Sequence, residues 1–330
     1  MNPASDKKVV VIGGGTGLPV LLRGLKKYPI DLSAIVTVAD DGGSSGRLRN
    51  DLSIPPPGDI RNVLAALSEV EPLIEQLFQH RFTTSNELCG HSLGNLMIAA
   101  LTSIKGDFVR AVQEMSRVLN VRGKVLPAAN ESVVLHAVMD DGTIVSGESK
   151  IPYSGKRIRR VFLTPDNVAP LPETITAIRE ADLIVVGPGS LYTSILPNLL
   201  VSEIGREVSQ AKAHKVYICN LMTQAGETLD YTASDHVKAI HRHLNQPCID
   251  TILVNKTPIP EEIQKRYEKE LAKPVIFDPD ELRALGLNIL YEEIVSVKDG
   301  IIRHDTDRVA QILYSLLVKI TENGSELSRR

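Results

Sequence analysis

The sequence predicts an α/β fold with a Rossmann-like, doubly wound and mainly parallel sheet. Short apolar, β-branched runs alternate with helix-forming segments along the 330-residue chain, as in parallel strands joined by helices. Each run ends in, or is followed by, Gly, Asp or Asn, at the strand ends where ligand loops of this fold class lie. A glycine-rich turn follows the first run. The predicted strands span residues 8–13, 34–39, 183–187, 215–219 and 251–255.

The first predicted strand ends in a glycine-rich turn, and residues 18–27 follow it as a predicted helix. The turn consists of Gly13, Gly14, Gly15, Thr16 and Gly17. Glycines let the backbone approach an anion closely, and the N-terminus of a helix presents unpaired N–H groups to phosphate. The turn is not a P-loop, because no Lys-Ser/Thr pair follows it, and it departs from the dinucleotide fingerprint, because Leu18 stands at the third glycine position. The turn therefore predicts a phosphorylated ligand without naming it, and a plain tight turn is the alternative.

Composition excludes several classes of protein. The chain is 43% hydrophobic and 23% charged with a net charge of −3, so it lacks the basic excess of proteins whose main partner is nucleic acid. Cys89, Cys219 and Cys248 are far apart, which suggests neither a zinc site nor a disulfide framework. No apolar run has the length of a membrane span. We expect a cytoplasmic protein.

The middle and the end of the chain depart from the simple alternation. A helical block is expected over about 59–120, and an antiparallel excursion over about 125–161, with a hairpin turn at Asp140-Asp141-Gly142. The basic run 156–160 fits the exposed edge of a strand better than a phosphate contact. Residues 321–330 lack a pattern and are expected to be disordered.

A polar loop is predicted after the second strand, over residues 40–49. An acidic residue at this place can accept a hydrogen bond from a ribose hydroxyl, which suits Asp40, and carboxylates can instead hold Mg²⁺ against phosphates. The guanidinium groups can contact phosphate bidentately. The candidates in this loop are Asp40 and Asp41, also as metal ligands, with Ser44, Ser45 and Arg47. A solvent loop with an Asx turn is the alternative.

Two further helix starts carry candidate ligand residues. Asp59 is predicted to cap the helix after three prolines, and Arg61 and Asn62 then lie in its first turn, where the helix dipole disfavours arginine unless an anion is near. A second helix is predicted to start at His91 or Ser92, which places Asn95 in its first turn. A lone histidine such as His91 is more often structural than ligating.

The remaining candidates follow later strands. Gly187, Gly189 and Ser190 belong to a second glycine turn after an apolar strand, which suits phosphate or a sugar. Asn220 and Thr223 follow the next strand and can reach the same crevice. Arg303 precedes a helix that Asp305 or Thr306 is predicted to cap. His241 and His243 face apart on a helix and so do not form a chelate.

These motifs together resemble those of the gluconeogenesis factor (YvcK-like) family, within the group built like CofD, the 2-phospho-L-lactate transferase. The resemblance runs from about residue 9 to 317 and rests on GGGTGL at 13–18, ADDGGSSGRLR at 39–49, GDIRN at 58–62, HSLGN at 91–95, GPGSLYTS at 187–194 and NLMTQ at 220–224. It implies a single CofD-like α/β domain over 1–320. It also implies UDP-sugar binding, for example of UDP-N-acetylglucosamine, and support of cell shape and envelope synthesis during gluconeogenic growth. It brings no catalytic step.

Three hypotheses follow. The leading one is a nucleotide-sugar sensor, in which the two glycine turns hold the diphosphate, Asp40 holds ribose or Mg²⁺, and Arg303 closes on phosphate. The second is a Mg²⁺-dependent phosphotransferase that uses Asp40 and Asp41, although the DDGGSSGRLR form departs from the transferase branch. The third is a nicotinamide dehydrogenase, for which the chain offers no recognisable acid or base. A homo-oligomer and a protein partner in envelope synthesis stay open.

Overall fold

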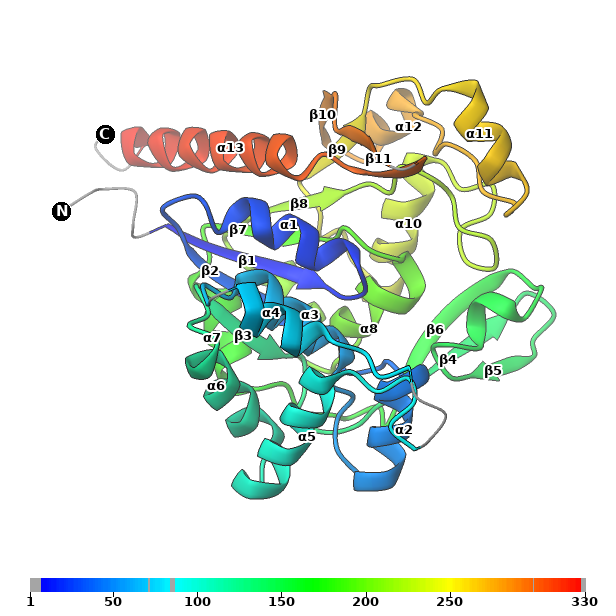
Figure 1. Ribbon diagram of the computed structural model, residues 1–330. Coiled ribbons are helices and arrows are strands. Elements are labelled where there is room, and N and C mark those ends of the chain that lie inside the picture. The colour runs from blue at the N-terminus through cyan, green and yellow to red at the C-terminus, as the bar shows by residue number, and fades with distance from the viewer. Residues whose placement is uncertain (1–6, 71, 84–86, 299, 328–330) are drawn as a thin grey trace.

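The centre of the molecule is a seven-stranded parallel sheet, which confirms the predicted α/β, Rossmann-like class (Figure 1). The computed structural model describes residues 7–70, 72–83, 87–298 and 300–327. In sheet order the strands are β10 (Asn288–Glu292), β9 (Thr251–Asn255), β8 (His214–Ile218), β7 (Leu183–Val186), β1 (Lys8–Gly13), β2 (Asp31–Val36) and β3 (Lys124–Pro127). From β1 the chain adds β2 and β3 toward one edge of the sheet, and from β7 it adds β8, β9 and β10 toward the other edge. The switch point of the sheet therefore lies between these two neighbouring strands.

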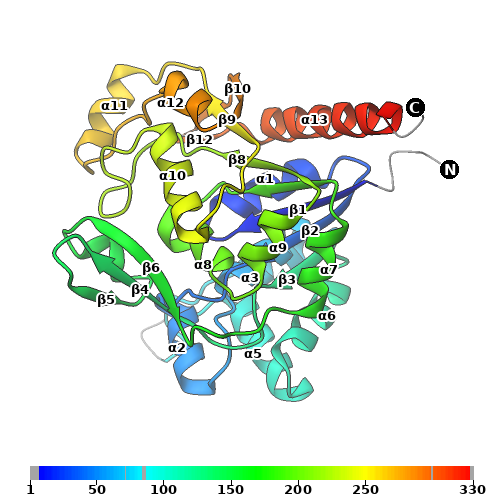
Figure 2. The ribbon, with the colours of Figure 1, turned by 180° about the vertical axis from the view of Figure 1, so that it is seen from behind.

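Helices cover both faces of the sheet. One face carries α1 (Gly17–Leu25), α3 (Gly58–Leu67), α6 (Phe108–Val118) and α13 (Thr306–Leu327); the other carries α7 (Pro172–Glu180), α8 (Leu196–Leu199), α9 (Ile204–Gln210), α10 (Ala233–Leu244) and α12 (Pro279–Ala284) (Figures 1 and 2). Successive strand residues point to opposite faces of the sheet. Val11 therefore packs in the core on the α1 side, and Ile12 packs in the core on the α10 side. Both are fully buried, which is why the central strands read as continuous apolar runs.

Four more helices and two small sheets complete the fold. The helices are α2 (Gly43–Leu52), α4 (Pro72–Gln79), α5 (Leu93–Lys105) and α11 (Glu261–Glu268), and short helical turns span Ile151–Tyr153 and Leu191–Ile195. The antiparallel hairpin β11 (Val295–Lys298) and β12 (Ile301–His304) precedes α13. The other antiparallel sheet has the order β5 (Ile144–Ser146), β4 (Val134–Met139) and β6 (Ile158–Thr164). None of the helices in the described ranges is long and apolar enough to cross a membrane.

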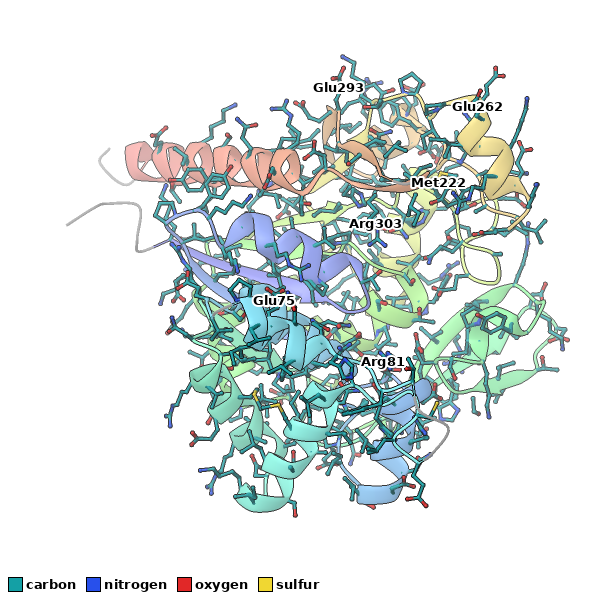
Figure 3. The ribbon with its side chains drawn as sticks, in the orientation of Figure 1. Glu75, Arg81, Met222, Glu262, Glu293 and Arg303 are labelled. Atoms are coloured by element: carbon teal, nitrogen blue, oxygen red, sulfur yellow. The ribbon has the colours of Figure 1, made fainter. Side chains whose placement is uncertain are left out.

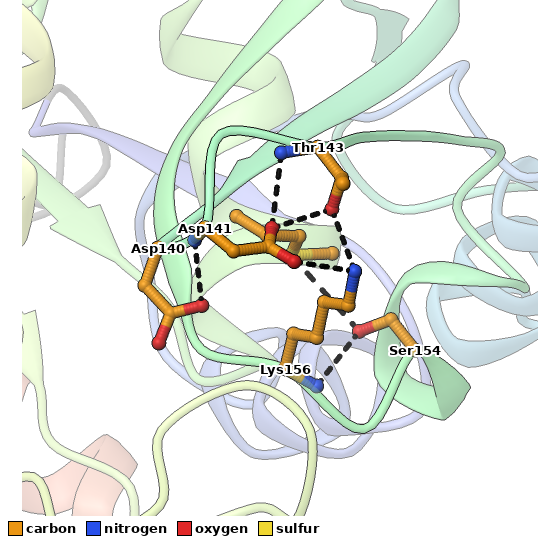
Figure 4. A network of polar contacts seen from close by, with 6 residues as sticks. Asp140, Asp141, Thr143, Ser154 and Lys156 are labelled. Carbon is orange, nitrogen blue, oxygen red and sulfur yellow. Dashed lines mark hydrogen bonds and ion pairs between the residues drawn. The ribbon is translucent and has the colours of Figure 1, made fainter.

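The antiparallel excursion is closed by a polar network at its hairpin turn (Figure 4). One carboxylate oxygen of Asp141 accepts hydrogen bonds from the backbone N–H and the hydroxyl of Thr143, at 3.0 and 2.6 Å. The other oxygen lies 2.6 Å from the Lys156 ammonium, and these donors hold the pKa of Asp141 below its usual range. The predicted hairpin is thus confirmed. The basic run 156–160 enters β6, an edge strand, with Arg159 and Arg160 exposed as expected.

Several predicted boundaries were wrong. Residues 43–49 were expected in a loop but belong to α2, whose weak helix formers are compensated by the burial of Ser44, Ser45 and Leu48. The second strand ends at Val36, before the predicted 34–39 run is complete. The excursion was expected to start at 125, but 124–127 form β3 at the edge of the parallel sheet. Strands β10, β11 and β12 were not predicted.

Two predictions about helix ends were also wrong. Asp59 does not cap α3, because the N-cap is Pro57 and Asp59 lies inside the first turn. The segment 321–330 was expected to be disordered, but α13 continues to Leu327, and residues 328–330 lie outside the described residues. The Thr321 hydroxyl donates back to the Leu317 carbonyl at 2.9 Å within this helix. The helical block over about 59–120, the Ser92 cap of α5 and the Asp305 hydrogen bond to the Arg308 N–H agree with the predictions.

We predict that Gly24→Ala destabilises the protein. A Cβ at Gly24 would lie 2.8 Å from the Thr306 carbonyl oxygen and 3.0 Å from Ala310 Cβ, so α13 must move away from α1. Overpacking of this kind costs about 1–3 kcal/mol, which outweighs the helix propensity of about 1 kcal/mol that alanine adds. Urea unfolding measures the change. Arg23→Ala, which removes only an exposed ion pair with Glu75, is the control and should change stability by less than about 1 kcal/mol. A stabilised Gly24→Ala variant would contradict the close contact.

Candidate functional site

The two predicted glycine turns lie against each other at the switch point between β1 and β7. A Cβ on Gly15 would lie 3.1 Å from the Ser194 hydroxyl oxygen, and one on Gly17 would lie 3.2 Å from the Pro188 carbonyl oxygen. Gly15 also has a φ of +63°, and Gly187 has a φ of +89°, conformations that residues with a side chain rarely adopt. Glycine is therefore required here for the close approach of the two turns.

Asn198, which the sequence analysis did not single out, fastens the two turns together. It lies in α8 and is fully buried. Its side-chain amide donates to the Gly13 carbonyl oxygen at 3.0 Å and to the Ser194 carbonyl oxygen at 2.8 Å. The Gly13 carbonyl oxygen also accepts from the Thr37 N–H at 3.2 Å, so Asn198 adds a second donor to it. One amide thus bonds to both turns and fixes their separation.

A cavity of about 730 Å³ opens beside the joined turns. This volume is in the range of small-molecule sites. Besides Tyr153, its wall is built from four parts of the chain: the first glycine turn with α1, the second glycine turn, the loop after β8, and a lobe formed by the end of α11 with the residues that follow it, β12 and the start of α13. Arg303 and Met222, which come from the last two of these parts, lie near each other in Figure 3.

The structure brings nine of the predicted residues to the wall of this cavity. They are Gly14, Gly15, Thr16, Gly17, Gly189, Ser190, Asn220, Thr223 and Arg303. Thr16 precedes α1 and makes no side-chain cap, so no hydroxyl occupies the N–H groups of the first turn of that helix. Thr223 is committed to the fold, since its hydroxyl accepts from the Lys273 N–H at 3.0 Å.

Polar groups in the loop after β8 are organised around Gln224. Its amide donates to the Ser190 hydroxyl at 2.9 Å, and its carbonyl oxygen accepts from Asn220 at 3.4 Å. The side-chain oxygen of Asn220, Oδ1, is buried and has no hydrogen-bond partner within the described residues. An unpartnered buried acceptor is costly, and at a cavity wall it is a place for a donor on a ligand.

The lobe opposite the glycine turns contributes one cation and one aromatic ring. The Tyr267 hydroxyl accepts from the Ile302 N–H at 3.0 Å and so ties the end of α11 to β12. Arg303 is exposed and forms no ion pair with any described residue. The neighbouring His304 bonds to the Cys219 carbonyl at 3.1 Å, and burial lowers its pKa to about 4. Arg303 is therefore the cation that this lobe offers at neutral pH.

Glu227 holds the second glycine turn through hydrogen bonds to the residues that follow it. This buried carboxylate accepts from the Tyr192 N–H at 3.1 Å and from the Thr193 hydroxyl at 2.8 Å, at the start of the helical turn Leu191–Ile195. Burial raises its pKa, whereas these donors lower it. Glu227 thus satisfies N–H groups at the start of the helical turn.

The carboxylate of Asp59 already binds one of the backbone N–H donors of the first glycine turn. It accepts the Gly15 N–H at 2.9 Å. Burial and the charge of Asp40 raise the pKa of Asp59 to about 6, against the opposing effect of that hydrogen bond. A phosphate at this turn must therefore use donors other than Gly15 or displace a carboxylate that is easily protonated.

Asp40 and Asp41 lie behind the glycine turn and not on the cavity wall. One oxygen of Asp40 accepts from the Gly42 N–H at 2.9 Å, and one of Asp41 accepts from the Ser149 N–H at 2.8 Å. Glu148 is held near them: burial, followed by the charges of Asp40, Asp59, Asp41 and Glu227, raises its pKa to about 8. These groups form one acidic cluster.

The acidic cluster fits a magnesium site in one binding mode. No three carboxylates, histidines or cysteines among the described residues are placed to hold a metal ion by themselves. Mg²⁺ commonly takes one or two carboxylates and completes its shell with water and ligand phosphates. The second oxygens of Asp40 and Asp41, which accept none of the hydrogen bonds above, fit that mode only, with phosphate supplying the remaining ligands.

Ser44, His91 and Asn95 form a buried network that the sequence analysis did not predict as a unit. The Ser44 hydroxyl lies 2.9 Å from His91 Nδ1 and accepts from the Asn95 amide at 3.0 Å. Burial lowers the pKa of His91. The network joins the start of α2 to the start of α5 and thereby holds the loop that carries Asp40 and Asp41.

The other predicted ligand residues are engaged with the protein. Arg47 donates to the Cys89 carbonyl, and Arg61, which is buried, donates to Gln79 and to the Asn62 side-chain oxygen at 2.5 and 2.7 Å. Ser45 is buried beside Gly58. Their predicted contacts with phosphate stay predictions. Sequence reasoning missed Asn198, Tyr267 and Glu148, because nothing in the local pattern shows which distant segment each one meets.

Comparison with known proteins gives a consistent picture. Residues 9–295 match the model of the family described as 2-phospho-L-lactate transferase CofD. The chain is 68% identical over 310 residues to a gluconeogenesis factor of Bacillus subtilis, covering 94% of this chain and 98% of that protein. It is 61% identical over 307 residues to one of Halalkalibacterium halodurans, covering 93% and 95%. A crystal structure of a protein from Bacillus halodurans superposes with a TM-score of 0.92 at 60% identity, covering 94% of this chain and 99% of that one.

We predict that Asp59→Asn stabilises the protein at neutral pH. The pKa of Asp59 is higher in the folded state than in the unfolded chain, so its ionisation destabilises the fold above about pH 6, and this penalty disappears as the pH falls toward 4. Asparagine keeps an acceptor for the Gly15 N–H and removes the charge. Urea unfolding at pH 7.5 should give a gain of about 1–3 kcal/mol, which vanishes at pH 4.

Asp307→Asn is the matched control, because that carboxylate is exposed and pairs only with Lys27 at the surface. It should change stability little at either pH. Destabilisation of Asp59→Asn at pH 7.5 that disappears at pH 4 would contradict the prediction, because it would show that the charge of Asp59 supports the fold.

Proposed function

This chain belongs to the CofD family and groups with its gluconeogenesis factors, and on that premise we propose that it binds a nucleotide sugar, such as UDP-N-acetylglucosamine, as a cytoplasmic sensor. The observation that carries the proposal is the cavity at the switch point. It combines two glycine turns with an arginine that forms no ion pair and a buried side-chain amide oxygen that has no hydrogen-bond partner among the residues described. In doubly wound sheets nucleotides bind outside the carboxyl ends of the strands at this point.

The wall of the cavity offers hydrogen-bond donors, a hydrogen-bond acceptor and apolar surface to such a ligand. The first-turn N–H groups of α1 and the hydroxyl of Ser190 offer donors to a diphosphate, and Arg303 offers a charge from the opposite side. The unpartnered oxygen of Asn220 can accept from a hydroxyl or an imide N–H. Met222, Leu221 and Val309 supply apolar surface. Asp40, which lies outside the cavity wall, would hold ribose or Mg²⁺ at the edge of this site.

The cellular part of the proposal rests on the relatives alone. Proteins with high identity to this chain are named gluconeogenesis factors. We propose that occupancy of the cavity is passed to a protein that acts in envelope synthesis and cell shape during gluconeogenic growth. A homo-oligomer would offer one way to couple occupancy to such a partner.

A second candidate function is Mg²⁺-dependent phosphoryl or phosphoester transfer. The matching family model is described as a transferase, and the acidic cluster lies next to the first glycine turn through Asp59. In this reading Mg²⁺, when bound, neutralises phosphate charge, while Asp40 and Asp41 hold and orient it. The buried Ser44 network keeps the backbone that carries both carboxylates in place.

We expect Arg303→Ala to weaken the binding of UDP-N-acetylglucosamine by about ten-fold or more, because a charge-assisted contact with phosphate is lost. Isothermal titration calorimetry measures the dissociation constant. Arg308→Ala is the control, since that arginine lies near in sequence but pairs with Glu292 outside the cavity. Wild-type protein that binds neither this ligand nor UDP would overturn the sensor proposal.

The role of Mg²⁺ is tested with Asp40→Asn and Asp41→Asn. We expect Mg²⁺ to tighten binding to the wild-type protein and to have a much smaller effect on either variant, because each loses a charged metal ligand. Asp51→Asn, an exposed position in α2, is the control. Analysis of the same mixtures separates the two functions: intact ligand supports a sensor, and Mg²⁺-dependent consumption of ligand supports a transferase. A Mg²⁺ effect that survives in both variants would remove the metal role.

A further inference from the structure

Tyr153 is an aromatic side chain that lines the cavity and yet stands in solvent. It is 88% exposed, more than the other large hydrophobic side chains in the described part of the chain. An aromatic ring gains free energy when its faces are covered, so a ring left open at the wall of a cavity is available to a ligand. The sequence analysis did not single out this residue.

The backbone that carries Tyr153 is fixed from its own side. Tyr153 ends the short helical turn 151–153, in which Ile151 is fully buried. The N–H of Tyr153 donates to the Lys150 carbonyl at 3.1 Å, and the N–H of Ser154 donates to the Ile151 carbonyl at 3.2 Å. Ser154 then joins the network of Lys156 and Asp141 (Figure 4). The ring thus projects from a held turn.

The same turn is fixed against the cavity wall. Gly226, which has a φ of +77°, approaches Pro152 so closely that a Cβ there would lie 1.8 Å from the Pro152 carbonyl oxygen. This contact joins the antiparallel excursion to the loop after β8, whose residues Met222 and Ala225 line the cavity. The excursion therefore contributes one aromatic side chain to a site that is otherwise built on the parallel sheet.

We propose that the ring of Tyr153 stacks on the planar base of the bound nucleotide. This inference deepens the proposed function and rests on it. Phosphates are matched by N–H groups and Arg303, whereas the faces of a tyrosine ring offer no donor and match a flat, weakly polar group. Stacking of a base on an aromatic side chain tolerates different bases, so Tyr153 contributes affinity for the nucleoside part, and the buried Asn220 oxygen is left to discriminate.

The test compares three ligands on the wild-type protein, Tyr153→Ala and Tyr153→Phe by calorimetry. The ligands are UDP-N-acetylglucosamine, UDP and N-acetylglucosamine 1-phosphate. We expect Tyr153→Ala to weaken binding of the first two by the same factor, roughly 5- to 100-fold, and to leave any binding of the sugar phosphate unchanged. Tyr153→Phe keeps the ring and should bind like the wild-type protein. Ile144→Ala, an exposed position of the same small sheet outside the cavity, is the matched control.

Each other outcome overturns the inference. Wild-type affinity of Tyr153→Ala for UDP refutes the stacking and leaves the proposed function intact. A loss confined to ligands that carry the sugar places the ring against the sugar and also refutes it. If the wild-type protein binds neither UDP nor UDP-N-acetylglucosamine, the proposed function and the inference fail together.

A second measurement reports the contact directly. The chain contains no tryptophan, so Tyr153→Trp introduces a single indole that can be excited selectively. A base stacked on this ring should quench its fluorescence on addition of UDP, and the midpoint of the quench should match the calorimetric dissociation constant. N-acetylglucosamine 1-phosphate at saturation should not quench. Unchanged fluorescence of a variant that calorimetry shows to be saturated with UDP would overturn the stacking.

Discussion

The site depends on the hydrogen bonds of one buried amide, Asn198. Beyond the carboxyl ends of parallel strands, the backbone leaves the regular hydrogen-bonding pattern of the sheet. At the switch point, the two glycine turns follow the neighbouring strands β1 and β7. Asn198 donates to a carbonyl of each glycine turn and so fixes how far apart the turns lie. The glycines suit these turns because Gly15 and Gly187 adopt positive φ and because a Cβ on Gly17 would lie only 3.2 Å from the Pro188 carbonyl oxygen. The joined turns form one side of the cavity.

The charge near the junction poses a physical problem for any phosphate ligand. Asp59 already accepts from the Gly15 N–H, and Glu148, Asp40 and Asp41 lie in the same cluster. A second anion at this turn would be repelled unless protons or a divalent cation offset the charge. The raised pKa values of Asp59, about 6, and Glu148, about 8, show that the cluster takes up protons readily. The binding of an anion at the first turn would therefore be coupled to proton uptake or to Mg²⁺.

The sequence predicted most of what depends on local patterns. The central strands were found because burial on both faces gives continuous apolar runs, and the cap at Ser92 because capping is local. Helix α2 was missed because its glycines and serines resemble a loop and are held by contacts with α5. β10 was missed because its residues are only partly buried. Of the candidate site, the two glycine turns, the loop after β8 and Arg303 were predicted, but Asn198, Tyr267 and Tyr153 were not, since their importance comes from partners far away in the sequence.

The separation of the acidic cluster from the cavity wall bears on the choice between sensing and transfer. A transferase needs its metal ligands to face the reacting phosphate. Here the first glycine turn lies between the cluster and the cavity, and Asp59 spans the two through the Gly15 N–H. A ligand held along the cavity meets donors, an arginine and apolar surface before it meets the carboxylates. The arrangement therefore favours recognition, and chemistry at Asp40 and Asp41 would first require the contact between Asp59 and Gly15 to open.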